Sequence, residues 1–252
     1  MKRNKWLTGA IILLAISGCN TDKPKREALN QLPIKEIIIE SEVKAEEESK
    51  HAFKVNIRYP EWQVQTSVSK QAKEQMIKHI QYYLLAQDET LTTNIKQGIK
   101  QFREEYDSLT THFPNSALFY EFKSHGEIIS RDKELTSIRF NTYKYTGGAH
   151  GMHWTSFLNL SSKTGKELPI DSLIRDKKTF AASLDHALRK RYNMTDTDNW
   201  ESFGFFINSF QWPRNIGFTA DSIQAVYNPY EIRSYADGTI KIALPRKAFD
   251  KH

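Results

Sequence analysis

The sequence predicts an α+β protein: a mostly antiparallel sheet of about seven strands with about three helices packed on it. Runs in which apolar and polar residues alternate occur in both halves of the chain. Amphipathic segments with apolar residues three or four positions apart lie between them. Short turns join most successive strand-like runs, which favours hairpins and therefore antiparallel pairing.

The first elements are two strands and two helices. Residues 34–43, IKEIIIESEV, are rich in isoleucine, and residues 53–59 alternate apolar and polar side chains, which indicates one buried face. Pro60 ends the second strand. Apolar residues then recur at helical spacing over 68–84 and over 91–106, so each segment is predicted to be a helix with one packed face.

The rest of the chain returns to the strand pattern around one more helix. A helix is expected over 180–192, because apolar residues recur every fourth position and basic residues occupy its last turn. The remaining strands are expected at 117–130, 135–145, 152–168, 218–232 and 240–245.

The N-terminus has the three parts of a secretory signal. Basic residues in the first five positions precede an apolar run, and Ile16-Ser17-Gly18-Cys19 resembles the lipobox of bacterial lipoproteins. We expect residues 1–18 to be a signal peptide, Cys19 to carry lipid, and residues 19–33 to be a flexible tether. The protein would then be anchored to a membrane of the bacterial envelope by its lipid and face away from the cytoplasm.

The composition limits the kinds of bond and partner that the protein is expected to form. Cys19 is the only cysteine, so the mature chain can form no internal disulfide. The signal carries three positive charges, and its removal lowers the formal net charge from +6 to +3. Because no basic stripe is present, we expect no nucleic-acid partner. We also expect no cofactor.

The stretch YTGGAHGMH between two predicted strands is the strongest candidate site. Its three glycines exceed what an ordinary hairpin requires, and glycine lets a ligand approach the backbone closely. The alternative interpretation is a turn whose glycines only supply backbone angles. The candidate binding residues are Tyr145, Gly147, Gly148, His150 and Gly151.

A second candidate group lies in the tyrosine-rich segment YNPYEIRSY, where Tyr230 and Glu231 could contact a sugar ring or a protein partner. A surface carboxylate beside a turn is the plainer interpretation of Glu231. His150 and His153 invite a metal interpretation, but no third ligand stands nearby, so we predict no metal site. No Gly-x-Ser-x-Gly elbow is present, and we assign no catalytic residue.

Several segments together resemble one known family. The stretches VNIRYPEW, FNTYKYTGGAHGMHWTSFLNLSSKTGKELPIDSLI and FTADSIQAVYNPYEIRSYADGTIKIALP are similar to the extracytoplasmic domain family shared by the anti-sigma factor RsiV and the N-terminal part of the peptidoglycan deacetylase PdaC. The resemblance covers about residues 35–248, with a PdaC-like half at 34–160 and an RsiV-like half at 161–252. The chain departs from the pattern at Arg233, Ser234 and Asp237.

The resemblance implies a non-enzymatic binding or sensing module of the cell envelope, whose ligand is peptidoglycan or a wall-degrading protein such as lysozyme. We expect the chain to be this extracytoplasmic module alone. Two alternatives stay open: an enzyme acting on wall glycans or peptides with His150 as base or metal ligand, and a structural envelope lipoprotein.

Overall fold

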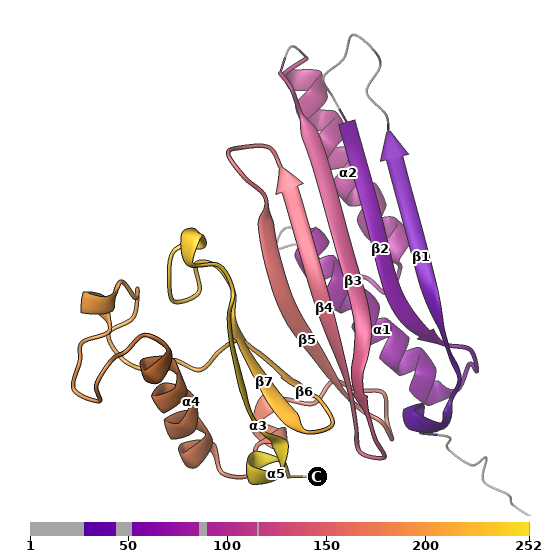
Figure 1. Cartoon of the computed structure of the whole chain (residues 1–252). Helices are drawn as coiled ribbons and strands as arrows, with labels where there is room; N and C mark the ends of the chain where they lie inside the picture. The colour runs from indigo at the N-terminus through magenta and orange to yellow at the C-terminus, as the bar shows by residue number, and fades with distance from the viewer. Residues whose placement is uncertain (1–27, 44–51, 86–89, 115, 252) are drawn as a thin grey trace, which may run out of the picture.

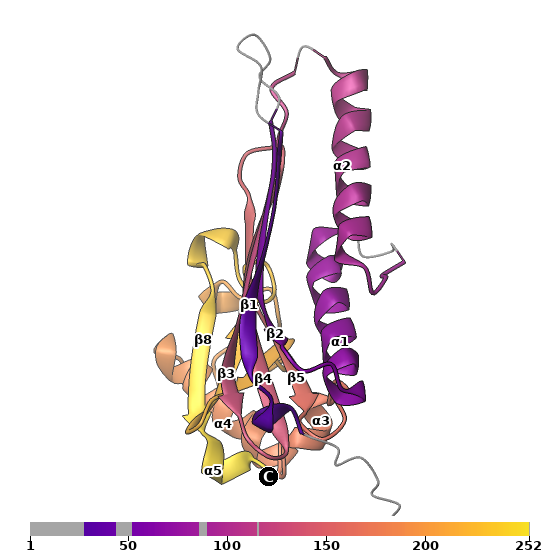
Figure 2. The same ribbon diagram turned by 90° about the vertical axis from the view of Figure 1, so that its right-hand side faces the viewer.

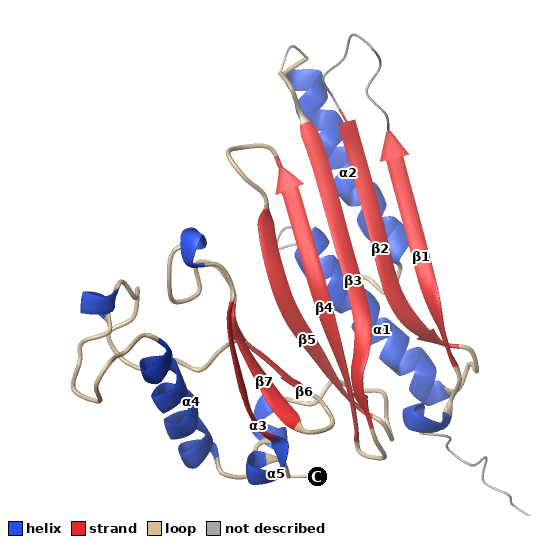
Figure 3. Ribbon diagram, viewed as in Figure 1, coloured by secondary structure: helices blue, strands red, loops and turns tan. Residues whose placement is uncertain are grey.

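The computed structural model describes residues 28–43, 52–85, 90–114 and 116–251. The predicted signal peptide, Cys19 and most of the tether lie outside these residues. The protein is α+β as predicted, and its described residues form eight strands in two sheets and five α-helices (Figures 1 and 3). Within the described part of the chain, no helix has the length and apolar composition needed to cross a membrane.

The first sheet is mixed, which corrects the prediction of one mostly antiparallel sheet of about seven strands. Its five strands lie in the order β1-β2-β3-β4-β5, and only β2 and β3 pair in parallel. The two helices between β2 and β3 return the chain to the same end of the sheet, and such a crossover produces parallel strands. The strands are β1 (Ile34–Val43), β2 (Ala52–Trp62), β3 (Phe119–Arg131), β4 (Leu135–Thr146) and β5 (Met152–Ser161).

The crossover helices cover one face of this sheet, as Figure 2 shows. They are α1 (Ser67–Leu84), which matches the predicted 68–84, and α2 (Ile95–His112), which begins four residues later and ends six residues later than the predicted 91–106. The side chain of Thr66 accepts a hydrogen bond from the backbone N–H of Ser69 and so caps α1, and Asn94 caps α2 through Lys96. Their apolar stripes pack against alternate residues of β2, β3 and β4 to form the larger hydrophobic core.

The C-terminal part forms a second sheet of three antiparallel strands on the other face (Figure 2). It contains β6 (Asn215–Phe218), β7 (Ser222–Tyr227) and β8 (Ile240–Pro245). The one strand predicted over 218–232 is wrong, because a turn separates β6 from β7. In that turn Thr219 and Ser222 bond to each other through both backbone and side chain, a local arrangement that apolar alternation does not reveal.

The predicted third helix is α4 (Lys177–Arg191), which packs on the second sheet. The prediction of about three helices is low by two four-residue helices, α3 (Ile170–Leu173) and α5 (Arg246–Phe249). Three short 3₁₀ turns complete the described elements: η1 (Leu29–Gln31), η2 (Glu201–Phe203) and η3 (Tyr235–Asp237).

The two sheets are joined where β6 crosses β4 and β5. The side-chain amide of Asn159 donates to the carbonyl of Ile216 at 2.8 Å, and the N–H of Phe218 donates to the hydroxyl of Ser137 at 3.1 Å. Leu135, at the start of β4, belongs to the hydrophobic core of the C-terminal part. These contacts fix the second sheet against strands β4 and β5 at one edge of the first sheet. The division into halves at 160/161 stays a prediction.

Candidate functional site

The glycine loop joins β4 to β5, and two of its glycines serve backbone conformation. Gly147 and Gly148 both have φ of +94°, a region that side-chain-bearing residues rarely adopt. A Cβ added at either position would have no atom within 4 Å, so neither is required by packing. The hydroxyl of Tyr145 donates to the carbonyl of Gly148 at 2.9 Å and closes the turn.

The third glycine is required by a close contact. A Cβ on Gly151 would lie 2.3 Å from the ring of Tyr143, so the backbone passes directly over that ring. The hydroxyl of Tyr235, in η3, donates to the carbonyl of Gly151 at 2.8 Å. The loop is therefore tied to the C-terminal part of the chain at this residue.

His150 extends this junction into a row of rings. Its imidazole stacks on Tyr235 with ring centroids 4.0 Å apart, and the ring centroid of Tyr230 lies 5.7 Å from that of Tyr235. The structure thus brings the glycine loop and Tyr230 together, although the sequence separates them. Tyr235 joins them. Its place in the tyrosine-rich segment was the only sequence feature that pointed to it as a site residue. Nδ1 of His150 lies 3.1 Å from the carbonyl oxygen of Gly151, so the ring has the contacts of a packed surface side chain.

Glu231 faces a different region from the glycine loop. Its carboxylate accepts hydrogen bonds from the backbone N–H groups of Arg214 at 2.8 Å and of Asn228 at 3.0 Å. Burial nevertheless raises the pKa of the Glu231 carboxyl above its ordinary value, because desolvation outweighs the two hydrogen bonds and the nearby positive charge of Arg214. Glu231 therefore connects two backbone segments and lines the cleft described next.

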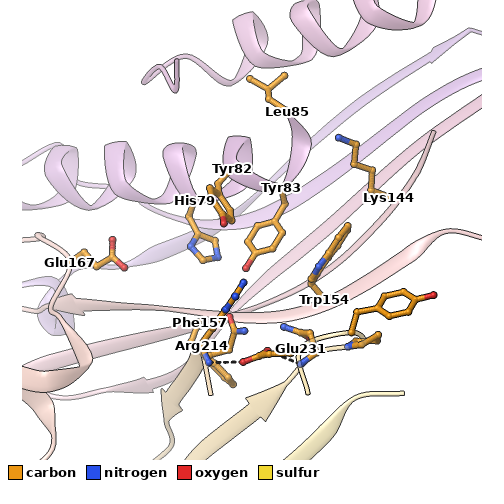
Figure 4. Close-up of a pocket in the computed structure, with 14 residues that line it drawn as sticks. His79, Tyr82, Tyr83, Leu85, Lys144, Trp154, Phe157, Glu167, Arg214 and Glu231 are labelled. Atoms are coloured by element: carbon orange, nitrogen blue, oxygen red, sulfur yellow. Dashed lines mark hydrogen bonds between the residues drawn. The ribbon is translucent and has the colours of Figure 1, made fainter. Parts of the chain in front are cut away.

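An open cleft of about 640 Å³ lies between α1 and the segments before β6 and after β7. Figure 4 shows His79, Tyr82 and Tyr83 projecting from α1 on one side, Arg214 and Glu231 on the other, and Trp154 between them. Aromatic rings and charged groups thus converge on one space. The lining residues are His79, Tyr82, Tyr83, Leu85, Lys144, Trp154, Phe157, Glu167, Arg214, Asn215, Asn228, Pro229, Tyr230 and Glu231.

The charged groups of the cleft differ in their hydrogen bonds to the rest of the protein and in their pKa values. The ammonium of Lys144 donates to the carbonyl of Leu84 at 2.9 Å, and burial lowers its pKa. Burial also raises the pKa of Glu167, which shares the cleft with Glu231. Both carboxyl groups therefore hold a proton to a higher pH than an exposed glutamate does.

A serine–histidine pair lies at the base of the cleft. Nε2 of His79 is 2.9 Å from the hydroxyl of Ser156, and the hydroxyl of Tyr83 also bonds to Ser156. Such a pair is the geometry of an activated nucleophile, but burial lowers the pKa of His79 to about 4, which makes the imidazole a weak base at neutral pH. Ser156 is 1% exposed, so a substrate cannot reach it. The three groups form a satisfied polar contact between α1 and β5.

Sequence reasoning missed most of this cleft. His79, Trp154 and Arg214 come from a helix, a strand and a loop that lie far apart in the chain, and none belongs to a recognisable motif. The adjacent Tyr82 and Tyr83 were the available signal, because only one of two neighbouring helical residues can face the core. Across the described ranges, no three His, Cys, Asp or Glu side chains are grouped as a metal site requires. His153 packs on Tyr143 instead, with centroids 4.6 Å apart.

Comparison with models of known protein families shows to which family the chain belongs. A family model described as deacetylase PdaC matches residues 14–153, more than half of the chain. The chain belongs to the PdaC family. A second model, described as a protein of unknown function (DUF3298), matches residues 171–247 of the PdaC-family chain. Both findings confirm the resemblance that the sequence carries.

Two solved structures of DUF3298-family proteins share the fold of the PdaC-family chain. The protein from Bacteroides fragilis superposes with a TM-score of 0.63 at 19% identity, covering 88% of this chain and 93% of that one. The protein from Pseudomonas aeruginosa superposes with a TM-score of 0.60 at 19% identity, covering 87% and 94%. At this identity the likeness is one of fold. Among curated proteins, no match was found.

Proposed function

We propose that this PdaC-family chain is a lipid-anchored, extracytoplasmic binding module of the bacterial envelope that holds a peptidoglycan glycan in its aromatic cleft. The observation that carries the proposal is the convergence of Trp154, Tyr83 and Tyr230 on one open cleft of about 640 Å³. Aromatic rings offer flat apolar faces for sugar rings, while a few polar groups fix orientation.

The N-terminal sequence supports the location. A positive head, an apolar run and Ile16-Ser17-Gly18-Cys19 together have the composition of a lipoprotein signal, although they lie outside the described residues. A lipid on Cys19 would hold the cleft close to the membrane surface, within reach of the wall.

A wall-degrading protein such as lysozyme is the second candidate ligand. The row formed by His150, Tyr235 and Tyr230 favours it, because Tyr230 is 52% exposed and exposed aromatic rings are typical anchors of protein interfaces. This row and the cleft share Tyr230, so the two ligands would use overlapping surfaces.

Glycoside hydrolysis is a candidate function of another class. Glu167 and Glu231 line the same cleft, and burial raises the pKa of both. A carboxyl group whose pKa is raised by burial is suited to act as a general acid, and hydrolysis of a glycosidic bond uses two carboxyl groups. A Glu167→Gln, Glu231→Gln double variant tests this: release of reducing ends from peptidoglycan by the wild type, lost in the variant, would establish it.

The binding proposal is tested with the full chain in detergent, incubated with purified peptidoglycan and, separately, with immobilised lysozyme. Trp154→Ala removes the cleft platform, and His150→Ala interrupts the ring row. Phe113→Ala is the matched control, because Phe113 is 56% exposed at the end of α2 and does not line the cleft. All variants are first checked for an unchanged melting temperature.

The glycan cleft is supported if the wild type is retained on peptidoglycan, Trp154→Ala weakens this retention at least ten-fold, and Phe113→Ala leaves it unchanged. Retention on lysozyme that His150→Ala weakens, with the peptidoglycan result negative, moves the function to the ring row. No retention of the wild type on either bait contradicts the proposal.

A further inference from the structure

Arg214 is a cation of the cleft whose side chain forms no hydrogen bond within the described part of the chain, although its charge acts on the carboxylate of Glu231. It is exposed at the cleft wall, directly before β6, and among the described residues none accepts a hydrogen bond from its guanidinium. Lys144, the other cation of the cleft, already donates to the carbonyl of Leu84. A guanidinium has five N–H donors in a planar fork that matches the two oxygens of a carboxylate. The free hydrogen-bonding capacity of this cleft is therefore suited to an anion.

The backbone around Arg214 is held in place by one carboxylate. Glu231 accepts from the backbone N–H of Arg214 and from that of Asn228, which ties together the two segments that form this wall. Because both bonds come from backbone N–H groups, they fix the backbone of Arg214 and leave the N–H donors of its guanidinium unused, while the charge of the guanidinium still acts on Glu231. Glu231 is thus a positioning residue for Arg214.

The same wall is attached to the strand that carries Trp154. The side-chain amide of Asn228 accepts from the N–H of Thr155 at 2.8 Å and donates to its carbonyl at 3.0 Å, as a neighbouring strand would. Thr155 is adjacent to Trp154, so one amide sets the spacing between the tryptophan ring and the wall that carries Arg214.

Tyr230 adds an exposed ring to the cleft in a backbone conformation that is costly for a residue with a side chain. It has φ of +67°, an uncommon value for a residue with a side chain, and its ring is 52% exposed. Its backbone N–H donates to the carbonyl of Arg233 at 3.0 Å, which closes the turn that holds it. Strain of this kind persists where the surrounding structure enforces it, and it is frequent at binding sites.

We propose that the cleft recognises a ring bearing a carboxylate, with Arg214 binding the carboxylate and Trp154 and Tyr230 contacting the ring. The inference rests on the proposed function and names the ligand class of the same cleft. In peptidoglycan this chemistry has two sources. One is the lactyl carboxylate of N-acetylmuramic acid, which is free only where the stem peptide has been removed, and the other is the terminal carboxylate of a stem peptide attached to that ring. A charge-assisted contact to a carboxylate strengthens binding by about ten-fold to a hundred-fold.

The experiment is calorimetric titration of the full chain in detergent with four probes. N-acetylmuramic acid differs from N-acetylglucosamine by the lactyl ether group that carries its carboxylate. Acetyl-alanyl-alanine and its C-terminal amide differ by the peptide carboxylate. Arg214→Gln removes the charge, and Arg214→Lys keeps the charge but loses the fork. Arg58→Gln is the matched control, because Arg58 lies on β2 and does not line the cleft.

We expect the wild type and Arg58→Gln to bind N-acetylmuramic acid at least ten-fold more tightly than N-acetylglucosamine. Arg214→Gln should abolish this preference, Arg214→Lys should reduce it, and Trp154→Ala should weaken both sugars alike. The protein could instead prefer the peptide acid over its amide, with this preference also requiring Arg214. That result would support Arg214 as a carboxylate receptor and identify the stem peptide as the source of the carboxylate.

Two outcomes overturn the inference and are distinguishable from failure of the proposed function. Equal binding of both sugars, weakened by Trp154→Ala, keeps the glycan cleft and removes Arg214 as a receptor. A carboxylate preference that survives in Arg214→Gln likewise removes Arg214. If peptidoglycan and all four probes fail to bind the wild type, the glycan cleft and the carboxylate inference both fall.

Discussion

The two turns that bound strand β5 both contain glycine at positive φ, yet they depend on it for different reasons. Before β5, a Cβ on Gly147 or Gly148 would meet no atom within 4 Å. After β5, a Cβ on Gly165 would lie 2.1 Å from the carbonyl oxygen of Val68 and 2.9 Å from the backbone nitrogen of Ala72, both in α1. The first turn is open to solvent and to ligands, whereas the second is packed against a helix backbone that cannot move aside.

This difference shows that a glycine-rich loop is not by itself the most constrained part of a fold. The stretch with three glycines attracts attention in the sequence, but it is Gly165 that allows a turn to pack directly against the backbone of α1. Because α1 supplies one wall of the aromatic cleft, the packed turn supports the site indirectly and the open turn borders the ring row directly.

Replacement of Gly165 by alanine should have the largest effect. Its φ of +72° and the contact with the α1 backbone both oppose a Cβ, so we expect the free energy of unfolding to fall by about 3 to 5 kcal/mol. Urea denaturation measures this loss. A fall of less than 1 kcal/mol would mean that α1 can move away from the turn, and the contrast between the two turns would disappear.

His79, which contacts the middle of β5, should make stability depend on pH. Burial lowers its pKa from 6.5 to about 4 in the folded protein, so below pH 6.5 the unfolded chain binds a proton that the native state does not. The free energy of unfolding should therefore decrease as pH falls from 6.5 to 4, by up to about 3 kcal/mol from this residue.

The variant His79→Gln isolates that contribution, because an amide can still reach the hydroxyl of Ser156 without titrating. Neighbouring Tyr83, Glu167 and Glu231 remain in both proteins, so the difference in pH slope between them reports on His79 alone. Parallel stability curves for wild type and variant between pH 4 and 6.5 would show that the imidazole titrates normally in the native state.

Gly151→Ala should have an intermediate effect. Its Cβ would collide with the ring of Tyr143, a side chain that can shift, so we expect a loss of about 2 kcal/mol. In a double-mutant cycle with Tyr143→Ala, most of this loss should vanish, because the ring is the obstacle. Additive losses would instead place the constraint in the backbone of the loop.

Gly148→Ala should have the smallest effect. Only its φ of +94° opposes a side chain, so a loss of about 1 kcal/mol is expected by thermal or urea denaturation. Gly148→Asn should cost less, because asparagine tolerates positive φ better than alanine does. A loss as large as that of Gly165→Ala would show that the open turn is constrained by contacts of its own.

Secondary structure was largely predictable for helices and strands that bury only one of their faces. The apolar spacing over 68–84 predicted α1, and the alternation over 53–59 predicted the buried face of β2. The pattern failed at 218–232, because Thr219 and Ser222 form a turn through their own polar groups inside an otherwise apolar run. Parallel pairing of β2 with β3 was also missed, since alternation is the same in parallel and antiparallel strands.

The candidate site was predictable only in part. Tyr145, Gly148 and His150 stood out because they cluster in the sequence, and Tyr230 stood out among neighbouring tyrosines. Trp154 and Arg214 did not, because Trp154 lies just after that cluster in a predicted strand and Arg214 lies in no motif, and they become cleft walls only when β5 and β6 meet. No local pattern encodes that meeting.

By itself, the sequence determined the α+β class, the helices and strands with one apolar face, and the family to which the chain belongs. These properties follow from local spacing and from short motifs. Only the tertiary structure decided the mixed sheet, the packed role of Gly165 and the cleft around Trp154 and Arg214. Each of these depends on contacts between residues that are distant in the chain. Burial at those contacts determines how much space a side chain has and whether it carries a charge.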